Sequence, residues 1–380
     1  MAQRQLDPTD PTTAGPAGPV SCDALADYLR AQATEFLRAL RLHRETGTGS
    51  AGSPGEEPVD AARSLRHAAR RITGTLHTFR PLLDPTWAEA MHPELAWLSG
   101  TLAREHAYAA RLERLLLALH RLSGVTPIPA QSAGGSRAGA TSSIRSAGAD
   151  TVPAKATASG TAGAPTAPPD RANLTLGAAK AGALLERQLT LARTRAHSAA
   201  LQALGSSRFH AVADNVAVLA SEVPLTPAAS TTPTNLRPLA AAAHERLCDA
   251  VTALPLLVAG HPYNAEALVH GLSFDPAPHP QDAPWHHVRL LLRLSRYAHE
   301  VLASAEAQVD VRMLTAGAAL NRHRDASEAA AAAAAAARTP RIAPATAYAL
   351  GVLHADQRHE VEAARFAFQQ SWEKKALSTR

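Results

Sequence analysis

Apolar residues recur every three to four positions along most of the chain, which is the spacing of a helix with one buried face. The clearest stripe lies between Val59 and Leu83, where Leu65, Ile72 and Leu76 fall on one side of a helix. Nowhere does the sequence alternate apolar and polar residues as a half-buried strand would. The pattern therefore predicts an all-α protein, with helices over 21–43, 59–83, 92–122, 174–204, 207–221, 236–254, 285–304, 309–337 and 343–375.

Proline, glycine and small polar residues mark where the helical pattern begins and stops. Pro93 and Glu94 suit the first turn of the third helix, which is therefore expected to begin near His92. Residues 125–172 contain hardly a large apolar side chain, so they cannot repay the entropy of ordering. We expect a disordered tail over 1–20, first-half helices over 21–124 and 173–223, a disordered insert over 125–172, and a second-half bundle over 234–376.

The two halves of the chain resemble each other weakly. Segment Ala62–Ile72 aligns with Trp285–Ser295 at an offset of 223 residues, which matches Arg66 to Arg289 and Arg70 to Arg293. Two more matches follow in the same order, Leu102–Ala107 with Leu320–Asp325 and Lys180 with His354. Three ordered matches indicate a duplicated helical bundle.

Composition narrows the class of protein. The 380 residues are 46% hydrophobic but only 4% aromatic, so the cores are expected to be small-residue helical packing. Two cysteines, Cys22 and Cys248, do not make a disulfide framework, which fits a reducing cytoplasm. The N-terminus lacks the apolar segment of a signal peptide, and the alanine run Ala329–Ala337 is too short to span a bilayer. We expect a soluble, cytoplasmic protein.

Positive charge is concentrated in two places. The formal net charge of +5 is modest, so it matters only where cations cluster. Between 61 and 83 there is no Asp or Glu, while Arg63, Arg66 and Arg70 stand at i, i+3 and i+7 on one helix face, with Arg71 beside them. Residues 285–299 repeat the arrangement with another acid-free column, formed by His286, Arg289, Arg293 and Arg296.

Such uncompensated columns suit an extended polyanion, because guanidinium groups pair bidentately with phosphate oxygens. Two other interpretations stay open at this point. In the first, each column is an ordinary solvated helix face. In the second, its arginines pair with acids from a neighbouring helix.

The motifs around these columns resemble those of the CHAD family, the conserved histidine α-helical domain. In the first half they are ARSLRHAARRITGTLHTFRPLLD and PELAWLSGTLAREHAYAARLERL; in the second half, WHHVRLLLRLSRYAHE, LNRHRDA and ALGVLH. The resemblance spans about residues 21–376. It implies two antiparallel helical bundles related by pseudo-twofold symmetry, with a basic channel or groove that binds inorganic polyphosphate. It also implies an association with polyphosphate granules.

The columns and the resemblance together give the candidate polyphosphate-binding residues. They are Arg63, Arg66, Arg70, Arg71, Lys180, His286, Arg289, Arg293, Arg296, His323 and His354. The first half departs more from the family pattern, with Arg63 in place of a histidine and His106, Ala107 and Ala109 where an arginine and acids are typical. In the second half, Asn321 and Arg324 replace a glycine and a glutamine. We therefore expect the second-half column to dominate binding.

No cofactor, metal or catalytic site is predicted. His286 and His287 point about 100° apart on a helix, and His354 and His359 stand at i, i+5, so neither pair has zinc-ligand spacing. There is no glycine-rich phosphate loop, no G-x-S-x-G and no H-E-x-x-H. The expected function is non-enzymatic polyphosphate binding. The alternatives are a degenerate CHAD scaffold for protein–protein interaction, or non-specific nucleic-acid binding through phosphates.

Overall fold

The computed structural model describes residues 20–48, 57–124, 169–231, 234–261, 269, 272, 279–303 and 310–373. Nearly all of the predicted tail and insert lies outside these residues. The described part of the chain is helical and contains no β-strand; its single extended feature is an isolated bridge between Leu83 and Leu225. The prediction of an all-α protein is confirmed.

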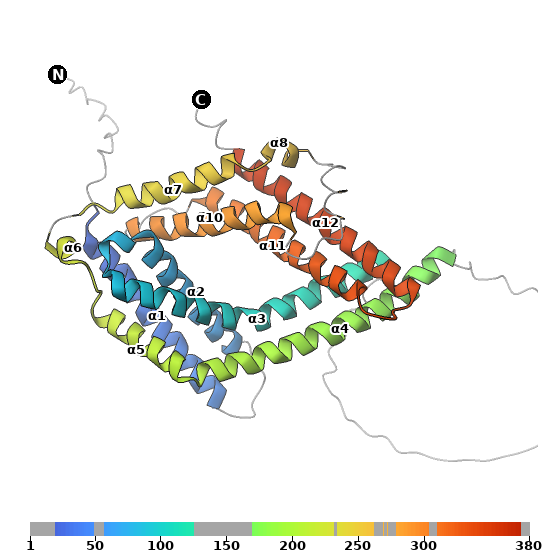
Figure 1. Ribbon diagram of the computed structural model, residues 1–380, viewed down its shortest axis with the longest axis horizontal. Helices are drawn as coiled ribbons and strands as arrows, with labels where there is room; N and C mark the ends of the chain where they lie inside the picture. Colours follow the sequence, from blue (N-terminus) through green and yellow to red (C-terminus); the bar gives the residue numbers. More distant parts are fainter. Residues whose placement is uncertain are drawn as a thin grey trace, which may run out of the picture.

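The helices follow the predicted order along the chain (Figure 1). Their bounds are α1 Cys22–Thr48, α2 Glu57–Thr78, η1 Arg80–Leu82, α3 Pro85–Ser123, α4 Pro169–Leu204, α5 Ser207–Ser221, α6 Pro227–Thr231, α7 Arg237–Thr252, α8 Leu256–Ala259, η2 Pro280–Asp282, α10 Ala283–Leu302, α11 Val311–Ala337 and α12 Pro344–Glu373.

Two bundles of antiparallel helices each enclose an apolar core. In the first, α1, α2, α5 and the beginning of α3 bury Phe36, Ile72 and Phe209, and α7 and α10 contribute Ala240 and Ala298 to the same core. In the second, α7, α10, the beginning of α11 and the end of α12 bury Trp285 and Phe368. In Figure 1 the first group is drawn in blue and teal with α5 in yellow-green, and the second in yellow, orange and red.

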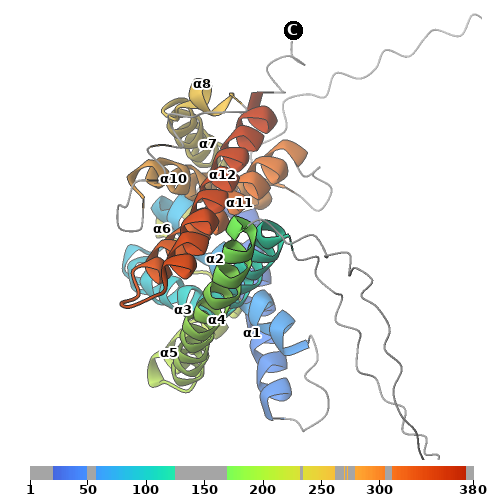
Figure 2. The same cartoon turned by 90° about the vertical axis from the view of Figure 1, so that its right-hand side faces the viewer.

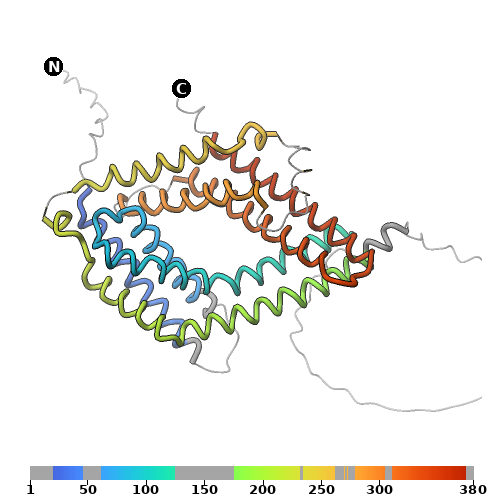
Figure 3. Tube along the Cα trace, in the orientation of Figure 1, coloured from blue at the N-terminus to red at the C-terminus, as the bar shows by residue number. Residues whose placement is uncertain are grey.

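A third core joins the two halves of the sequence. The second half of α3 and most of α4 run side by side as an antiparallel pair, as the tube in Figure 3 shows, and they pack on α11 and α12. Figure 2 shows α4, α11 and α12 next to one another at that end of the molecule. Ala329, Ala333 and Ala336 lie fully buried against Leu350 and Leu353. The small alanine side chains allow close packing of α11 on α12.

Helix α3 begins earlier than the sequence pattern predicted. Its N-cap is Asp84, whose carboxylate accepts a hydrogen bond from the Trp87 amide at 2.8 Å, and Pro85 occupies the first turn. Pro93, predicted to open the helix, lies inside it. Gly124 ends α3 with a φ of 69°, in the left-handed region that favours glycine. Helix α4 likewise begins at Pro169 rather than near Leu174.

Candidate anion-binding site

Helices α2 and α10, which carry the two cationic columns, cross at close range. A Cβ atom added to Gly74 of α2 would lie 2.6 Å from Cδ2 of Tyr297 and 3.3 Å from Cδ2 of Leu294, both on α10. Glycine is therefore needed at this crossing. The close approach brings the first-half column to the second-half column.

A cavity of about 590 Å³ lies where α2, α3, α10 and α11 meet. The four helices contribute nine arginines to its lining, against the two carboxylates of Asp325 and Glu328, so positive charge dominates the cavity. His67 and His106 line it as well. The nine arginines are Arg66, Arg70, Arg71, Arg111, Arg114, Arg289, Arg293, Arg296 and Arg324.

Four of these residues, Arg66, Arg70, Arg289 and Arg293, are called the central arginines below. All are half-buried, and none forms an ion pair with a carboxylate in the part of the chain that the structure describes. Arg289 donates only a long hydrogen bond, 3.3 Å from Nη1 to Oδ1 of Asn321. The Nε atoms of Arg66 and Arg289 are buried without a hydrogen-bond partner. A buried donor without an acceptor lowers the stability of the fold, so a bound ligand that accepts these hydrogen bonds would be stabilising.

Burial and mutual repulsion make the central arginines weaker bases than usual. Burial, followed by the charges of Arg293, Arg324 and Arg70, lowers the pKa of Arg289 to about 9. Burial and the charge of Arg293 lower the pKa of Arg70 to about 10. The pKa values of the other two central arginines are lowered in the same direction, again mainly by burial. An anion in the cavity would relieve this repulsion.

The outer arginines of the cavity are paired, as one of the alternative interpretations requires. Glu300 accepts a hydrogen bond from Nε of Arg71 at 2.9 Å and one from the Tyr28 hydroxyl at 2.9 Å, and it lies 3.4 Å from Nε of Arg296. Glu328 accepts a hydrogen bond from Nη2 of Arg111 at 2.5 Å. Pairing with acids of neighbouring helices therefore explains the rim of the cavity but not its centre.

Comparisons with known proteins identify the family of the chain. The CHAD domain model matches residues 31–333, which is most of the chain. The protein belongs to the CHAD family. A solved structure, PptA from Streptomyces chartreusis, is 62% identical over 94% of this chain and 100% of that chain, with a TM-score of 0.71. No curated protein matches the sequence. Helix α12 lies beyond the residues matched by the CHAD model, although it packs on α4 and α11.

The structure brings six of the predicted binding residues of this CHAD protein to the cavity: Arg66, Arg70, Arg71, Arg289, Arg293 and Arg296. Arg63 is exposed on α2 outside the lining, although its charge contributes to lowering the pKa of Arg66. Lys180 is exposed on α4, and it does not line the cavity.

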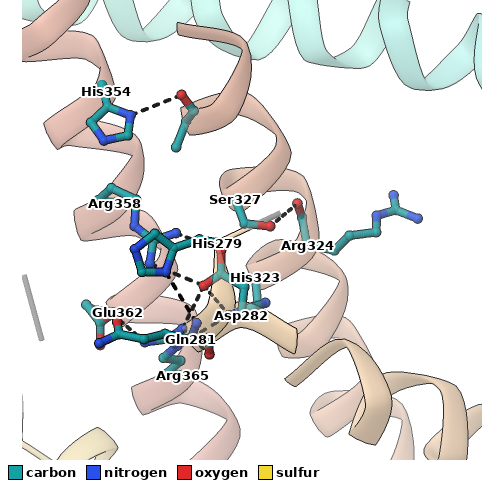
Figure 4. Close-up of polar contacts among 11 residues, drawn as sticks. His279, Gln281, Asp282, His323, Arg324, Ser327, His354, Arg358, Glu362 and Arg365 are labelled. Carbon is teal, nitrogen blue, oxygen red and sulfur yellow. Dashed lines mark hydrogen bonds and ion pairs between the residues drawn. The ribbon is translucent and has the colours of Figure 1, made fainter. Parts of the chain in front are cut away.

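The three predicted histidines lie away from the cavity lining. His286 is half-buried, with its ring centroid 5.4 Å from that of His323. His354 has its Nδ1 atom 3.0 Å from the carbonyl oxygen of Ala330, a contact that joins α12 to α11. Figure 4 shows His354 apart from the cluster around Asp282, on the part of α12 that precedes Arg358. Contact of these histidines with polyphosphate stays a prediction, and His286 lies near enough to the cavity for the charges of Arg289, Glu328 and Arg324 to affect its pKa.

His323 belongs to a buried cluster around Asp282 (Figure 4). Arg358 donates two hydrogen bonds to Asp282, at 2.7 and 3.2 Å, and Arg365 donates one at 2.7 Å. Nε of Arg365 also donates to Nε2 of His323 at 3.3 Å, while the ring of Trp285 stacks on the other side at 5.6 Å. Burial and the charge of Arg365 hold the pKa of His323 well below its usual value. This histidine, 1% exposed, links α11 to Arg365 of α12 and to Trp285 near the start of α10.

Five basic residues that line the cavity were not among the predicted binding residues. Arg111 and Arg114 lie on α3 among acids, so their spacing resembles an ordinary solvated face. Arg324 counted as a departure from the family pattern, yet its charge contributes to lowering the pKa of all four central arginines. His67 and His106 complete the set. The internal repeat contained a signal for two of them, because its alignment places His106 opposite Arg324.

The described residues contain no group of three His, Cys, Asp or Glu side chains placed to hold a metal ion. Within the same residues, no helix is long and apolar enough to cross a membrane. Cys22 and Cys248 are free thiols.

Proposed function

We propose that this CHAD protein binds inorganic polyphosphate, without hydrolysing it, in the cavity between α2, α3, α10 and α11. The observation that carries the proposal is the meeting of the four central arginines with no carboxylate partner among the described residues. A linear polyanion supplies negative charge at each guanidinium, and bidentate guanidinium–phosphate pairs give the contact both energy and direction. The family resemblance supports the same ligand, and the two free cysteines fit the cytoplasm as its location.

The lining of the cavity favours phosphate chains over nucleic acid. Proteins that bind single strands without sequence preference offer aromatic rings on which bases stack. Among the lining residues only Tyr297 carries a phenol or indole ring, and that side chain is 7% exposed. The lining therefore offers no exposed phenol or indole ring for base stacking, whereas arginines on four helices are available to phosphate groups.

A direct titration tests the binding proposal. Long-chain polyphosphate and duplex DNA, at equal phosphate concentration and about 150 mM salt, are titrated into the protein. We expect polyphosphate to bind much more tightly than DNA, and its affinity to fall steeply as salt is raised, because each contact releases counterions. Equal affinities would favour non-specific nucleic-acid binding, and binding of neither would favour the scaffold interpretation.

Paired variants locate the binding in the cavity. Arg70→Gln combined with Arg293→Gln removes one central arginine from each column and should weaken binding by at least about a hundredfold, since each contact contributes about 1.5–3 kcal/mol. Arg38→Gln combined with Arg41→Gln removes the same charge from exposed positions of α1 and should change affinity by less than about threefold. Similar losses in both double variants would argue against the cavity.

The absence of hydrolysis is tested separately. Purified protein incubated with polyphosphate should release no orthophosphate. Release that Arg70→Gln abolishes would show a catalytic site in the cavity and overturn this part of the proposal.

A further inference from the structure

The α3–α11 side of the cavity differs from the α2–α10 side, because its arginines already hold a carboxylate. Glu328 of α11 accepts a hydrogen bond from Nη2 of Arg111 on α3 at 2.5 Å, and its other oxygen lies 3.9 Å from Nε of Arg324. All three side chains line the cavity that contains the central arginines. Glu328 thus sits between two cations where a phosphate would otherwise be able to sit.

The exposure of the pair suits an exchange of partners. The Arg111 side chain is 18% exposed, so a lost carboxylate would leave a largely buried cation that requires a new anion. The Glu328 side chain is 41% exposed, so it can return to water at little cost when it is displaced. Its charge also opposes the lowering of the Arg289 pKa, which is caused first by burial and then by neighbouring arginines.

Glu300, on the opposite rim, does not share these properties. Its carboxylate is held by Arg71, Arg296 and the hydroxyl of Tyr28, and its side chain is 29% exposed. It joins α1, α2 and α10 and is not itself among the cavity-lining residues. Asp325 also lines the cavity, but its partner is the adjacent Arg324, whose Nε donates to it at 2.9 Å. Glu328 is therefore the rim acid whose displacement frees the largely buried Arg111.

We propose that Glu328 is an internal anion that competes with polyphosphate for Arg111, and so limits how much affinity a longer chain gains. This inference rests on the proposed function. A short anion fits among the central arginines without touching the Arg111–Glu328 pair. A longer chain reaches Arg111 only by displacing the Glu328 carboxylate, so part of its added contact energy is lost in breaking an existing ion pair.

The test is the affinity of the full chain for pyrophosphate and for long-chain polyphosphate, with Glu328→Gln as the variant. Glutamine keeps the shape of the side chain and removes its charge. We expect about three- to tenfold tighter binding of polyphosphate, corresponding to a fraction of one charge-assisted hydrogen bond, and a change of less than about twofold for pyrophosphate. The salt dependence for polyphosphate should become steeper, because more phosphates then find free cations.

Glu94→Gln is the matched control. Glu94 on α3 accepts a hydrogen bond from Arg208 of α5 at 2.6 Å, so it is also half of an arginine pair between helices, but it lies outside the cavity lining. The same change in net charge should leave both affinities within about twofold of the wild type. An equal gain in this control would attribute the effect to net charge and overturn the inference.

The outcomes separate this inference from the proposed function. Failure of the wild-type protein to bind polyphosphate would remove both. Wild-type binding with an unchanged or weaker affinity in Glu328→Gln would leave the proposed function intact and show that Glu328 positions Arg111 instead of competing with the ligand. Glu328→Asp, which keeps the charge but withdraws it from Arg111, should gain affinity in the same direction; a loss would likewise contradict competition.

Discussion

Arg70 and Arg293 belong to opposite halves of the sequence, yet the charge of Arg293 is the main electrostatic cause, after burial, of the lowered pKa of Arg70. Packing cations together in a partly buried place destabilises the unliganded fold. Such an arrangement is typical of a binding site, where strongly perturbed groups gather for a ligand. The absence of carboxylate partners among the described side chains is thus what identifies the central arginines as the residues of the proposed function.

Histidine protonation should make polyphosphate binding stronger at low pH. Burial, and then nearby arginines, lower the pKa values of His67 and His106, so both are neutral at pH 7. As pH falls below about 6.5, the unfolded chain takes up these protons first, and the unliganded protein loses stability. Bound polyanion favours the protonated imidazoles, so the rise in Tm caused by polyphosphate should be larger at about pH 5.5 than at about pH 8.

Thermal unfolding with and without polyphosphate checks this expectation. His67→Gln combined with His106→Gln should remove the increase while leaving the shift at about pH 8 nearly unchanged. A shift that is equal at both pH values in the wild type would contradict it.

Asp282 should be essential for stability. Its carboxylate is 2% exposed and is shared by Arg358 and Arg365, whose charges and hydrogen bonds hold its pKa low although burial acts in the opposite direction. Asp282→Asn would leave the buried Arg358 without its anion and Arg365 with Glu362 alone, and we expect a loss of about 3–5 kcal/mol in the free energy of unfolding. Glu35→Gln, which breaks the exposed pair with Arg38, should cost less than about 1 kcal/mol. Denaturant titration measures both, and equal losses would contradict a structural role for the cluster.

At the scale of the elements, the crossing of α2 and α10 determines the shape of the cavity. Gly74→Ala places a methyl group against the buried ring of Tyr297, so the helices must separate or the ring must move. We expect a loss of about 1–3 kcal/mol in stability and weaker polyphosphate binding, because the two columns move apart.

Gly100→Ala is the control for this substitution. A Cβ atom at Gly100, inside α3, would meet nothing within 4 Å, so alanine should stabilise the protein by up to about 1 kcal/mol through helix propensity. Calorimetry and a polyphosphate titration of both variants give the comparison. Unchanged affinity in Gly74→Ala would show that the crossing does not control the site.

The helical elements could be predicted from apolar periodicity, because one buried face is enough to define each helix. The start of α3 could not be predicted, because Pro93 resembles a first-turn proline in the sequence. The true start, Asp84 followed by Pro85, is recognised only when the structure shows the Asp84 side chain capping the helix. The arginine columns of α2 and α10 were recognisable because no acid interrupts them. Arg324 was not, because Asp325 and Glu328 follow it and mask its role until the fold places it beside the central arginines.

At the scale of the whole molecule, the fold replaces two separate binding surfaces with one. The sequence predicted that the second-half column would dominate, since the first half departs more from the family pattern. In the structure Arg66 and Arg70 line the same cavity as Arg289 and Arg293, and the third core, shared by α3, α4, α11 and α12, fixes the two halves together. We therefore expect a chain of phosphates bound in that cavity to contact both columns at once.

The last prediction follows from this shared cavity. Arg66→Gln with Arg70→Gln, and Arg289→Gln with Arg293→Gln, each remove two central arginines and should each weaken polyphosphate binding by about a hundredfold. Glutamine keeps helix propensity and most of the stem packing, and circular dichroism should show both double variants to be as helical as the wild type. Because every removed cation also relieves repulsion among those that remain, combining all four changes should cost less than the sum of the two losses. A large loss in the second-half pair alone would instead restore the asymmetry expected from the sequence and show that the ligand follows α10 without bridging to α2.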